Sequence, residues 1–198
     1  MSTLLILDVD QTIRRTKRGG EFMNDPQDQE LMPGLKGILT DYKADGAVIV
    51  GCNNNAGVEA KYQTLEDVIE AHRITLSLAP EVSYILFCPD YKGVICYQVS
   101  RTGIIRYLRG VKKTQAKDLD PETLQEISKA IWLPGLPSFR KPDIGMFSLA
   151  ALEHDSNSLT CISIGDRDED EQAARHINIP FMRTDAWLKM NTEEADDE

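Results

Sequence analysis

Two aspartates near the N-terminus, Asp8 and Asp10, have a spacing that would let their side chains act together in catalysis. They follow an apolar run, and the single residue between them places both carboxylates on the same face of an extended chain. Their mutual repulsion must be offset by a cation or a proton. Asp166, which follows another apolar run, supplies a third carboxylate. The pattern predicts a cation-binding site.

The ligand types indicate which cation this site would hold. Oxygen ligands without histidine or thiolate suit Mg²⁺ rather than zinc or copper. Lys141 and the backbone amides of residues 53–55 add positive potential, and a cation, a lysine and backbone donors together stabilise the charge of a phosphoryl group. One aspartate can then attack phosphorus and form an aspartyl-phosphate, while a second serves as general acid and base.

The elements that must position these residues follow from the alternation of short apolar runs with segments of helical period. This alternation is typical of an α/β fold, and it predicts a Rossmann-like parallel sheet of about five strands, with helices on both faces and no large cap domain. Ligands of such sheets bind at the carboxyl ends of the strands, so the polar segments that follow the strands should meet at one edge. The strands are predicted at residues 3–7, 47–50, 82–87, 160–164 and 179–182.

Helices are predicted between these strands. One begins after Pro33-Gly34, and a long amphipathic helix over 58–76 stops before Pro80. Another begins at Asp120-Pro121 and carries Leu124, Ile127 and Ile131 on one face, and a further helix begins at Pro142. The acidic residues Asp168, Glu169 and Glu171 are predicted at a solvated helix start, where the helix dipole favours negative charge.

Two segments do not fit the alternation. Residues 13–32 form a polar excursion, whose basic residues 14–18 are equally compatible with an exposed loop and with a substrate rim. Residues 91–139 form an insert that we expect to determine specificity; it has a predicted strand at 94–99 and a basic run over 101–117, for which a solvated helix face is favoured. We expect one domain over 1–190 and a disordered acidic tail over 191–198.

Composition limits the classes of function. The 198 residues carry a formal net charge of −10, which disfavours non-specific coating of nucleic acid. Apolar runs are far shorter than the roughly 20 residues that span a bilayer, so we expect no signal peptide, no transmembrane helix and no membrane partner. The four cysteines form no C-x-x-C pair, and the three histidines are scattered. These features predict a cytoplasmic protein without structural zinc.

Four motifs in order give the chain a family resemblance: DVDQT at 8–12, CNNNAG at 52–57, RKP at 140–142 and GDRDED at 165–170. In these motifs, over residues 3 to about 188, the chain resembles the haloacid dehalogenase superfamily of phosphohydrolases. Within it, AGV after the second motif, Cys88-Pro89 and RKP are similar to the minimally capped group. That group contains histidinol-phosphate phosphatase, heptose-bisphosphate phosphatase and the 3'-phosphatase domain of polynucleotide kinase.

The resemblance implies a role for each matched residue. It makes Asp8 the nucleophile and a Mg²⁺ ligand, while Asp10 protonates the leaving group, activates water and binds the metal through its backbone carbonyl. Lys141 would steady the nucleophile and the phosphate, and Asp166 would bind Mg²⁺. Further expected roles are a phosphoryl contact for Asn53, support of Lys141 or the metal for Asp170, and substrate contacts for Thr12, Asn54 and Arg140. Asn53 stands where the superfamily usually has Thr or Ser, so it offers an amide donor without a hydroxyl.

These observations predict a Mg²⁺-dependent phosphomonoesterase that acts on a small phosphorylated metabolite or on a phosphorylated nucleic-acid end. The alternative is a non-catalytic domain of the same fold that binds phosphate or a protein. A pure binding domain has no need of an acid two residues from a nucleophile, so the enzyme is favoured. The net charge and the lack of aromatic residues among the basic ones, Tyr107 apart, favour the metabolite. The sequence does not indicate an oligomeric state.

Overall fold

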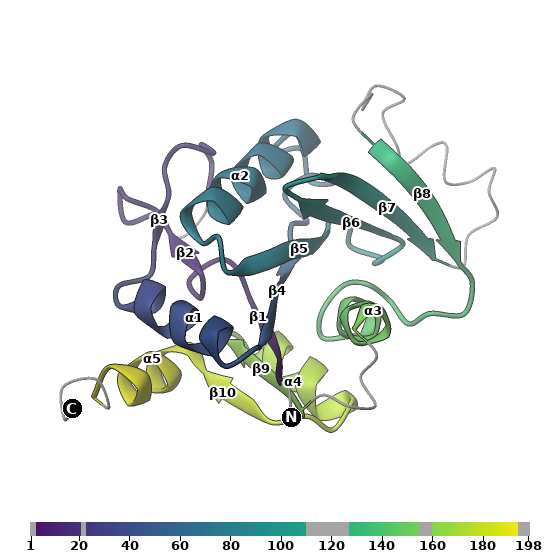
Figure 1. Ribbon diagram of the computed structural model, residues 1–198. Helices are drawn as coiled ribbons and strands as arrows, with labels where there is room; N and C mark the ends of the chain where they lie inside the picture. The colour runs from purple at the N-terminus through teal and green to yellow at the C-terminus, as the bar shows by residue number, and fades with distance from the viewer. Residues whose placement is uncertain (1–2, 21–22, 110–126, 155–159, 194–198) are drawn as a thin grey trace.

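The computed structural model describes residues 3–20, 23–109, 127–154 and 160–193. These residues form one eight-stranded sheet and the helices and loops around it (Figure 1). The strand order across the sheet is β10-β9-β1-β4-β5-β6-β7-β8. The strands are β1 (Thr3–Leu7), β4 (Val48–Asn54), β5 (Val82–Cys88), β6 (Ile95–Ser100), β7 (Gly103–Arg109), β8 (Ile127–Leu133), β9 (Thr160–Gly165) and β10 (Phe181–Arg183).

Five adjacent strands, β10, β9, β1, β4 and β5, run parallel to one another and confirm the predicted parallel sheet. The central strand β1 pairs with β4 from Leu4 opposite Val48 to Leu7 opposite Gly51. Its last four residues are buried, because a strand covered by helices on both faces needs apolar side chains on both. That requirement explains why β1 appears in the sequence as an uninterrupted apolar run.

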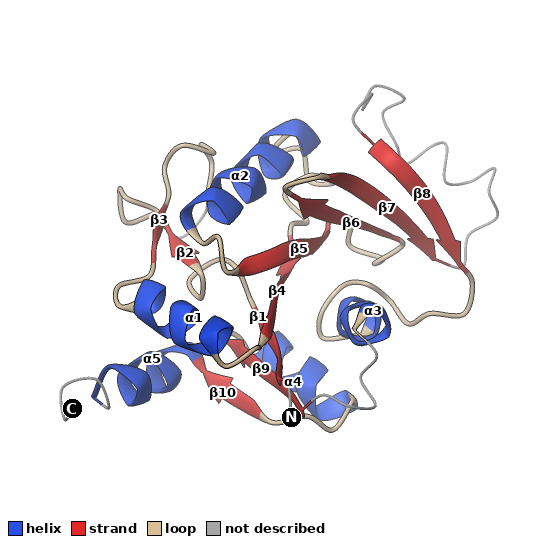
Figure 2. Cartoon of the chain, viewed as in Figure 1, coloured by secondary structure: helices blue, strands red, loops and turns tan. Residues whose placement is uncertain are grey.

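Helices cover both faces of the sheet (Figure 2). On one face, α1 (Leu35–Ala44), α2 (Leu65–Leu78) and α5 (Thr184–Glu193) contribute to a core cluster that includes Leu39, Ile69 and Trp187. On the other face, α3 (Gly145–Glu153) and α4 (Asp168–His176) contribute Phe147 and Ala173 to a second cluster. The two clusters fix the sheet between the helices, and with it the edge that carries the polar segments.

The sheet continues beyond its parallel part through β6, β7 and β8. Strand β6 confirms the strand predicted at 94–99, and it runs antiparallel to β5 and β7. The helix predicted to carry Ile127 and Ile131 is wrong, because these residues lie in β8, which pairs in parallel with β7. A strand can satisfy its backbone on a neighbouring edge that the sequence does not reveal. The extension adds to the sheet and does not form a large cap.

The basic segment is also not the predicted helix where the structure describes it. Residues Gly103–Arg109 form β7, and Arg101 donates to the backbone oxygens of Leu76, Pro80 and Val82 near the end of α2. These bonds satisfy carbonyl groups that a helix end leaves without partners. Residues 110–117 lie outside the described residues.

Helix α2 begins at Leu65 and not at residue 58 as predicted. Thr64 caps it, since the Thr64 Oγ1 atom accepts a bond of 3.0 Å from the Asp67 backbone N–H. This cap, followed by Glu66 and Asp67 in the first turn, fixes the start of the helix more strongly than the apolar period does. The preceding residues 56–63 form turns, with Lys61 at a φ of 61°.

Two smaller features complete the fold. Segment 13–32 contains a short hairpin of β2 (Arg14–Arg15) and β3 (Glu30–Leu31). Helix α5 includes residues 191–193, which we expected in the disordered tail, and residues 194–198 lie outside the described ones. Across the described parts of the chain, none of the helices has the length and apolar character needed to cross a membrane.

Candidate active site

A pocket of about 520 Å³ lies where the four motifs meet. Residues from each of 8–12, 52–57, 140–142 and 165–170 line its wall. Asp8 directly follows β1, Asn53 and Asn54 end β4, and Asp166 directly follows β9. The expectation that the strands bring these segments to one edge of the sheet is therefore confirmed. The lining residues are Asp8, Asp10, Met23, Asn24, residues 53–57, Tyr62, Gln63, Tyr91, Arg140, Arg167 and Glu169.

Lys141 connects three elements at the base of this edge. Its Nζ atom donates to Asp8 Oδ1 at 2.5 Å and to the Cys52 backbone oxygen at 2.7 Å. It also forms an ion pair of 2.6 Å with Asp170 Oδ1, and its side chain is only 1% exposed. A buried ammonium needs such a complete set of partners to offset its loss of hydration. Asp170, expected to support Lys141 or the metal, thus forms an ion pair with Lys141.

Three carboxylates form a group that could hold a metal ion. One oxygen from each of Asp8, Asp166 and Asp170 lies within 4.8 Å of the others. The Asp166 Oδ1 atom is buried and has no hydrogen-bond partner among the described residues. Three carboxylates facing one lysine leave an excess of negative charge, and oxygen ligands of this kind fit Mg²⁺. The side chain of Asp10 does not belong to this group.

Burial and the neighbouring charges shift the pKa values of these groups. Burial raises the pKa of Asp8 to about 8, with Lys141 opposing the shift and Asp170 adding to it. Burial and the nearby Asp170 also raise the pKa of Asp166. The pKa of Lys141 rises despite its burial, because Asp170 and Asp8 favour the charged ammonium. A divalent cation would take the place of the proton that these carboxylates otherwise favour.

Backbone contacts hold Lys141 in place. The Asn54 side chain bonds to both backbone polar groups of Lys141. Asn54 Oδ1 accepts from the Lys141 backbone N–H at 3.0 Å, and Asn54 Nδ2 donates to the Lys141 backbone oxygen at 2.9 Å. Asn54, expected to contact substrate, therefore positions Lys141 in addition to lining the pocket. The segment just before Lys141 is also packed closely against Gly93, which has a φ of 63°. A Cβ atom at Gly93 would be 2.7 Å from the Arg140 backbone nitrogen.

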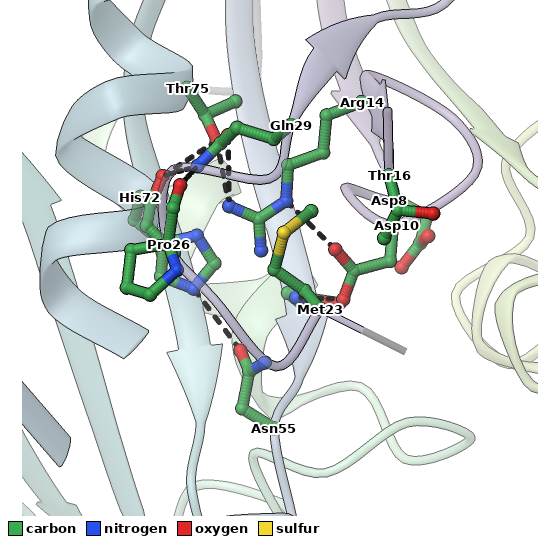
Figure 3. Close-up of polar contacts among 12 residues, drawn as sticks. Asp8, Asp10, Arg14, Thr16, Met23, Pro26, Gln29, Asn55, His72 and Thr75 are labelled. Carbon is green, nitrogen blue, oxygen red and sulfur yellow. Dashed lines mark hydrogen bonds and ion pairs between the residues drawn. The ribbon is translucent and has the colours of Figure 1, made fainter. Parts of the chain in front are cut away.

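Asp10 has partners different from those of Asp8, and its contact with Arg14 is drawn in Figure 3. Arg14 Nε donates to Asp10 Oδ1 at 2.8 Å, and Asn53 Nδ2 donates to Asp10 Oδ2 at 3.0 Å. Burial by itself would raise the pKa of Asp10, but the charge of Arg14 and the bond from Asn53 outweigh it and lower that pKa to about 2. Asp10 is therefore an anion that is balanced without a metal ion.

Two sequence expectations need correction here. Arg14 belongs neither to an exposed loop nor to a substrate rim, because its side chain is buried against Asp10, while Arg15, Lys17 and Arg18 are exposed. Thr12 was expected to contact substrate, but it is fully buried and its hydroxyl is bonded to that of Thr184 at 2.8 Å. Both side chains face the interior because the segment after β1 turns back on itself through Gln11, at a φ of 64°.

The sequence analysis missed two tyrosines that line the pocket. Tyr62 is 83% exposed and Tyr91 is 57% exposed, and the Arg140 guanidinium lies 5.5 Å from the centre of the Tyr91 ring. The Arg140 Nη1 atom is buried without a hydrogen-bond partner within the described chain. Tyr62 fell within the helix predicted over 58–76, and the Thr64 cap of α2 places it in the preceding loop. The signal in the sequence is Thr64 followed by Glu66 and Asp67, which is typical of a helix start.

Comparison with known proteins supports this assignment of the fold. The sequence profile of the family described as polynucleotide kinase 3 phosphatase matches residues 3–192. A solved structure of D,D-heptose 1.7-bisphosphate phosphatase from B. bronchiseptica, complexed with magnesium and phosphate, is similar with a TM-score of 0.57 and 18% identity, over 90% of this chain and 78% of that one. A protein from Mesorhizobium loti described as a HAD-like phosphatase gives 0.58 and 20%, over 89% and 69%. No curated protein matches the chain.

Proposed function

Because the chain belongs to the polynucleotide kinase 3 phosphatase family and is a phosphatase, we propose that it is a Mg²⁺-dependent phosphomonoesterase that removes the phosphate from the 3' end of a nucleic acid. The observation that carries this proposal is the composition of the pocket. One end holds the aspartates of the phosphatase motif, and the wall also carries two exposed tyrosines and two arginines. A phosphate and the ring of a terminal base could be bound there together.

The chemistry follows from the two aspartates. The Asp8 carboxylate attacks phosphorus and forms an aspartyl-phosphate, while the leaving oxygen takes a proton from the carboxyl form of Asp10. In the free protein Arg14 and Asn53 favour the Asp10 carboxylate, and the negative charge of an approaching phosphate group would favour uptake of the proton that Asp10 then donates. Asp10 then accepts a proton from water, whose oxygen attacks phosphorus and releases phosphate and the Asp8 carboxylate. Lys141 offsets the charge of Asp8 throughout. When bound by Asp8, Asp166 and the Asp10 carbonyl oxygen, Mg²⁺ would neutralise charge on the phosphoryl oxygens.

Asn53 retains a role toward the phosphoryl group in this proposal. An amide nitrogen has two N–H donors, and the bond to Asp10 Oδ2 uses one of them. The second donor remains available to a phosphoryl oxygen, because Asn53 lines the pocket. An amide can thereby replace the usual hydroxyl at this position.

The tyrosines and arginines support a nucleic-acid end as the substrate. Bases stack on aromatic side chains with a gain of about 1–3 kcal/mol each, and Tyr62 and Tyr91 offer such rings at the pocket. Arg140 has a donor without a partner in the described chain, and Arg167 lies on the same wall. The aromatic residues that the basic run lacks are thus supplied from other segments. A local site for one or two nucleotides is compatible with a net charge of −10, because it needs no extended basic surface.

A substrate panel tests the proposal. Oligonucleotides with a 3'-phosphate, the same oligonucleotides with a 5'-phosphate, and small sugar phosphates are assayed with Mg²⁺ and with a chelator. We expect the highest kcat/KM for the 3'-phosphate and no turnover after chelation. A preference for a small sugar phosphate would replace the substrate assignment, and no turnover of any ester would favour the non-catalytic alternative.

The tyrosines provide a sharper version of this test. We expect Tyr62→Leu and Tyr91→Leu to raise KM for the oligonucleotide by roughly 5- to 100-fold each, the equivalent of one lost stacking contact. Hydrolysis of a small ester should stay unchanged. The matched control is Leu152→Ala, which removes an exposed apolar side chain from α3, outside the residues that line the pocket.

We also propose that the protein works in the cytoplasm. Cys52, Cys88 and Cys96 are buried and form no disulfide, which suits the reducing cytoplasm.

A further inference from the structure

Both carboxylate oxygens of Asp10 are held by buried side chains. Arg14 Nε donates to Oδ1 at 2.8 Å, and Asn53 Nδ2 donates to Oδ2 at 3.0 Å. The side chain of Arg14 is only 1% exposed, whereas that of Asp10 is 27% exposed and lines the pocket. Asp10 is therefore fixed by buried protein groups and also borders the pocket.

The far end of Arg14 is anchored away from the pocket. Its Nη1 atom donates to Thr75 Oγ1 at 2.8 Å and lies 3.4 Å from Gln29 Oε1. Thr75 donates to Gln29 at 2.7 Å, and Gln29 Nε2 donates to the Ala71 backbone oxygen at 3.0 Å. These contacts connect Arg14 to helix α2 and to the segment before β3. Figure 3 shows the guanidinium between Asp10 on one side and Thr75 and Gln29 on the other.

The backbone between Asp10 and Arg14 brings the two side chains together. The Gln11 N–H donates to the Arg14 oxygen at 2.7 Å, and the Arg14 N–H donates to the Val9 oxygen at 3.0 Å. The positive φ of Gln11 allows this tight reversal of the chain. The pair therefore depends on a local turn whose geometry is set by its own hydrogen bonds.

This arrangement suits a group that must act twice. In the proposed mechanism Asp10 gives a proton to the leaving oxygen and then takes one from water, so its carboxylate has to keep one orientation through both steps. Misplacement of a catalytic group by about 1 Å can cost 10²-fold in rate. A side chain held at both oxygens cannot rotate away between the steps.

We propose that Arg14 is a positioning residue for Asp10, which acts on catalysis only through that carboxylate and, with Asn53, fixes its orientation. The inference rests on the proposed function, since it needs Asp10 to act as acid and base. In this proposal Arg14 makes no contact with substrate, since it is absent from the residues that line the main pocket and borders a neighbouring cavity of about 10 Å³.

The first experiment separates kcat from KM. Arg14→Met should lower kcat by roughly 10- to 100-fold and leave KM within about twofold, because no substrate contact is lost. Arg15→Met is the matched control: Arg15 is the next residue, is exposed, and pairs with Glu30 at 2.8 Å. It should leave both constants unchanged. Unchanged kcat in Arg14→Met, or a raised KM at constant kcat, would overturn the proposal.

The second experiment distinguishes positioning from a general structural role. Once Asp10→Asn has removed the acid and base, adding Arg14→Met should cause no further fall in kcat. A purely structural role would make the two losses multiply, because the sites would then act independently. Multiplying losses therefore contradict the inference.

A variant that keeps the buried charge covers the case in which Arg14→Met does not fold. Arg14→Lys should lower kcat at constant KM, since one ammonium cannot contact Asp10 and Thr75 together as the guanidinium does. Wild-type rates in Arg14→Lys would overturn the proposal. A wild-type protein that hydrolyses no phosphomonoester would refute the proposed function itself and the positioning role with it, whereas an active wild type with unaffected Arg14 variants refutes the positioning role alone.

Discussion

Asp8 and Asp10 are two residues apart, yet they lie in opposite electrostatic situations. On the lysine side, Asp8 and Asp170 share the positive charge of Lys141, and Asp166 beside them has only a longer ion pair of 3.9 Å with Arg167. On the arginine side, Asp10 has the charge of Arg14 to itself and a further bond from Asn53. One side is short of positive charge and the other is balanced. The comparison teaches that neighbouring carboxylates acquire different roles from their partners, and that the need for a metal ion is confined to the lysine side.

Neutralising each aspartate separately is the strongest way to test this division. Asp8→Asn removes the nucleophile and should lower kcat on the order of 10⁴- to 10⁶-fold with the fold intact. Asp10→Asn removes proton transfer and should lower kcat by roughly 10²- to 10⁴-fold. Steady-state rates and circular dichroism measure both. If Asp8→Asn keeps more than a few per cent of the rate, the aspartyl-phosphate mechanism is wrong.

Removing Lys141 should show how much of the stability of the protein depends on this lysine. Lys141→Met leaves the buried Asp8 and Asp170 without their cation, and we expect a loss of about 3–5 kcal/mol in the free energy of unfolding. Urea denaturation in the presence of a chelator gives this value. Lys36→Met, at an exposed position of α1, is the control and should change stability by less than about 0.5 kcal/mol. Equal effects of the two variants would contradict the importance assigned to Lys141.

Metal binding should stabilise the protein through the lysine side alone. At a concentration about 100 times its Kd, Mg²⁺ should add about 2.7 kcal/mol to the free energy of unfolding. The gain should vanish in Asp166→Ala and persist in Asp10→Asn, whose backbone carbonyl is retained. Thermal unfolding with and without Mg²⁺ measures it. Persistence of the gain in Asp166→Ala would place the metal elsewhere.

On the arginine side, we expect the free energy of unfolding to depend on pH through His72. This fully buried histidine binds Asn55 at 3.1 Å, and burial together with the charge of Arg14 lowers its pKa well below 6.5. Below pH 6.5 the unfolded chain binds a proton that the folded chain does not, so stability falls as the pH falls, by up to about 1.4 kcal/mol per pH unit.

Substitution of His72 isolates this contribution. His72→Gln should reduce the slope of stability between pH 6.5 and 5, whereas His176→Gln, at an exposed position of α4, should leave it as in the wild type. Denaturation curves at a series of pH values give both slopes. A wild-type slope in His72→Gln would mean that His72 is protonated in the folded protein.

The residues predicted correctly from the sequence are those whose place depends on local order. Asp8, Asn53 and Asp166 lie at strand ends that the apolar runs already indicate, and parallel strands bring such ends together. The side chain of Arg14 could not be placed in this way. Its burial depends on Thr75 and Gln29, which are distant in sequence, and the same basic run would suit an exposed loop.

Some predicted elements were wrong because the apolar period does not include the contact that decides between the alternatives. Ile127 and Ile131 fit a helix face as well as a strand, and only the neighbouring β7 decides between them. The position of Tyr62 was lost because the apolar period extended the helix past the Thr64 cap. Arg101 is exposed, as expected of a solvated charge, but it lies in the turn before β7 and not on a helix, and it donates to carbonyl groups beyond α2. The assignment of Ile127 and Ile131 and the contacts of Arg101 depend on partners far along the chain, whereas the start of α2 depends on a cap two residues after Tyr62.

The close approach of Gly93 to the segment before Lys141 has a consequence for how such an enzyme can change over evolutionary time. The Phe139 N–H donates to the Gly93 oxygen at 3.0 Å, so the two ends of the intervening chain are already joined to each other. Doubling the length of a loop whose ends are joined costs only about 0.6 kcal/mol. Insertions and deletions in the loops between these ends, outside the strands β6, β7 and β8, are therefore cheap, and substrate preference can diverge there while Lys141 and Asp8 keep their places.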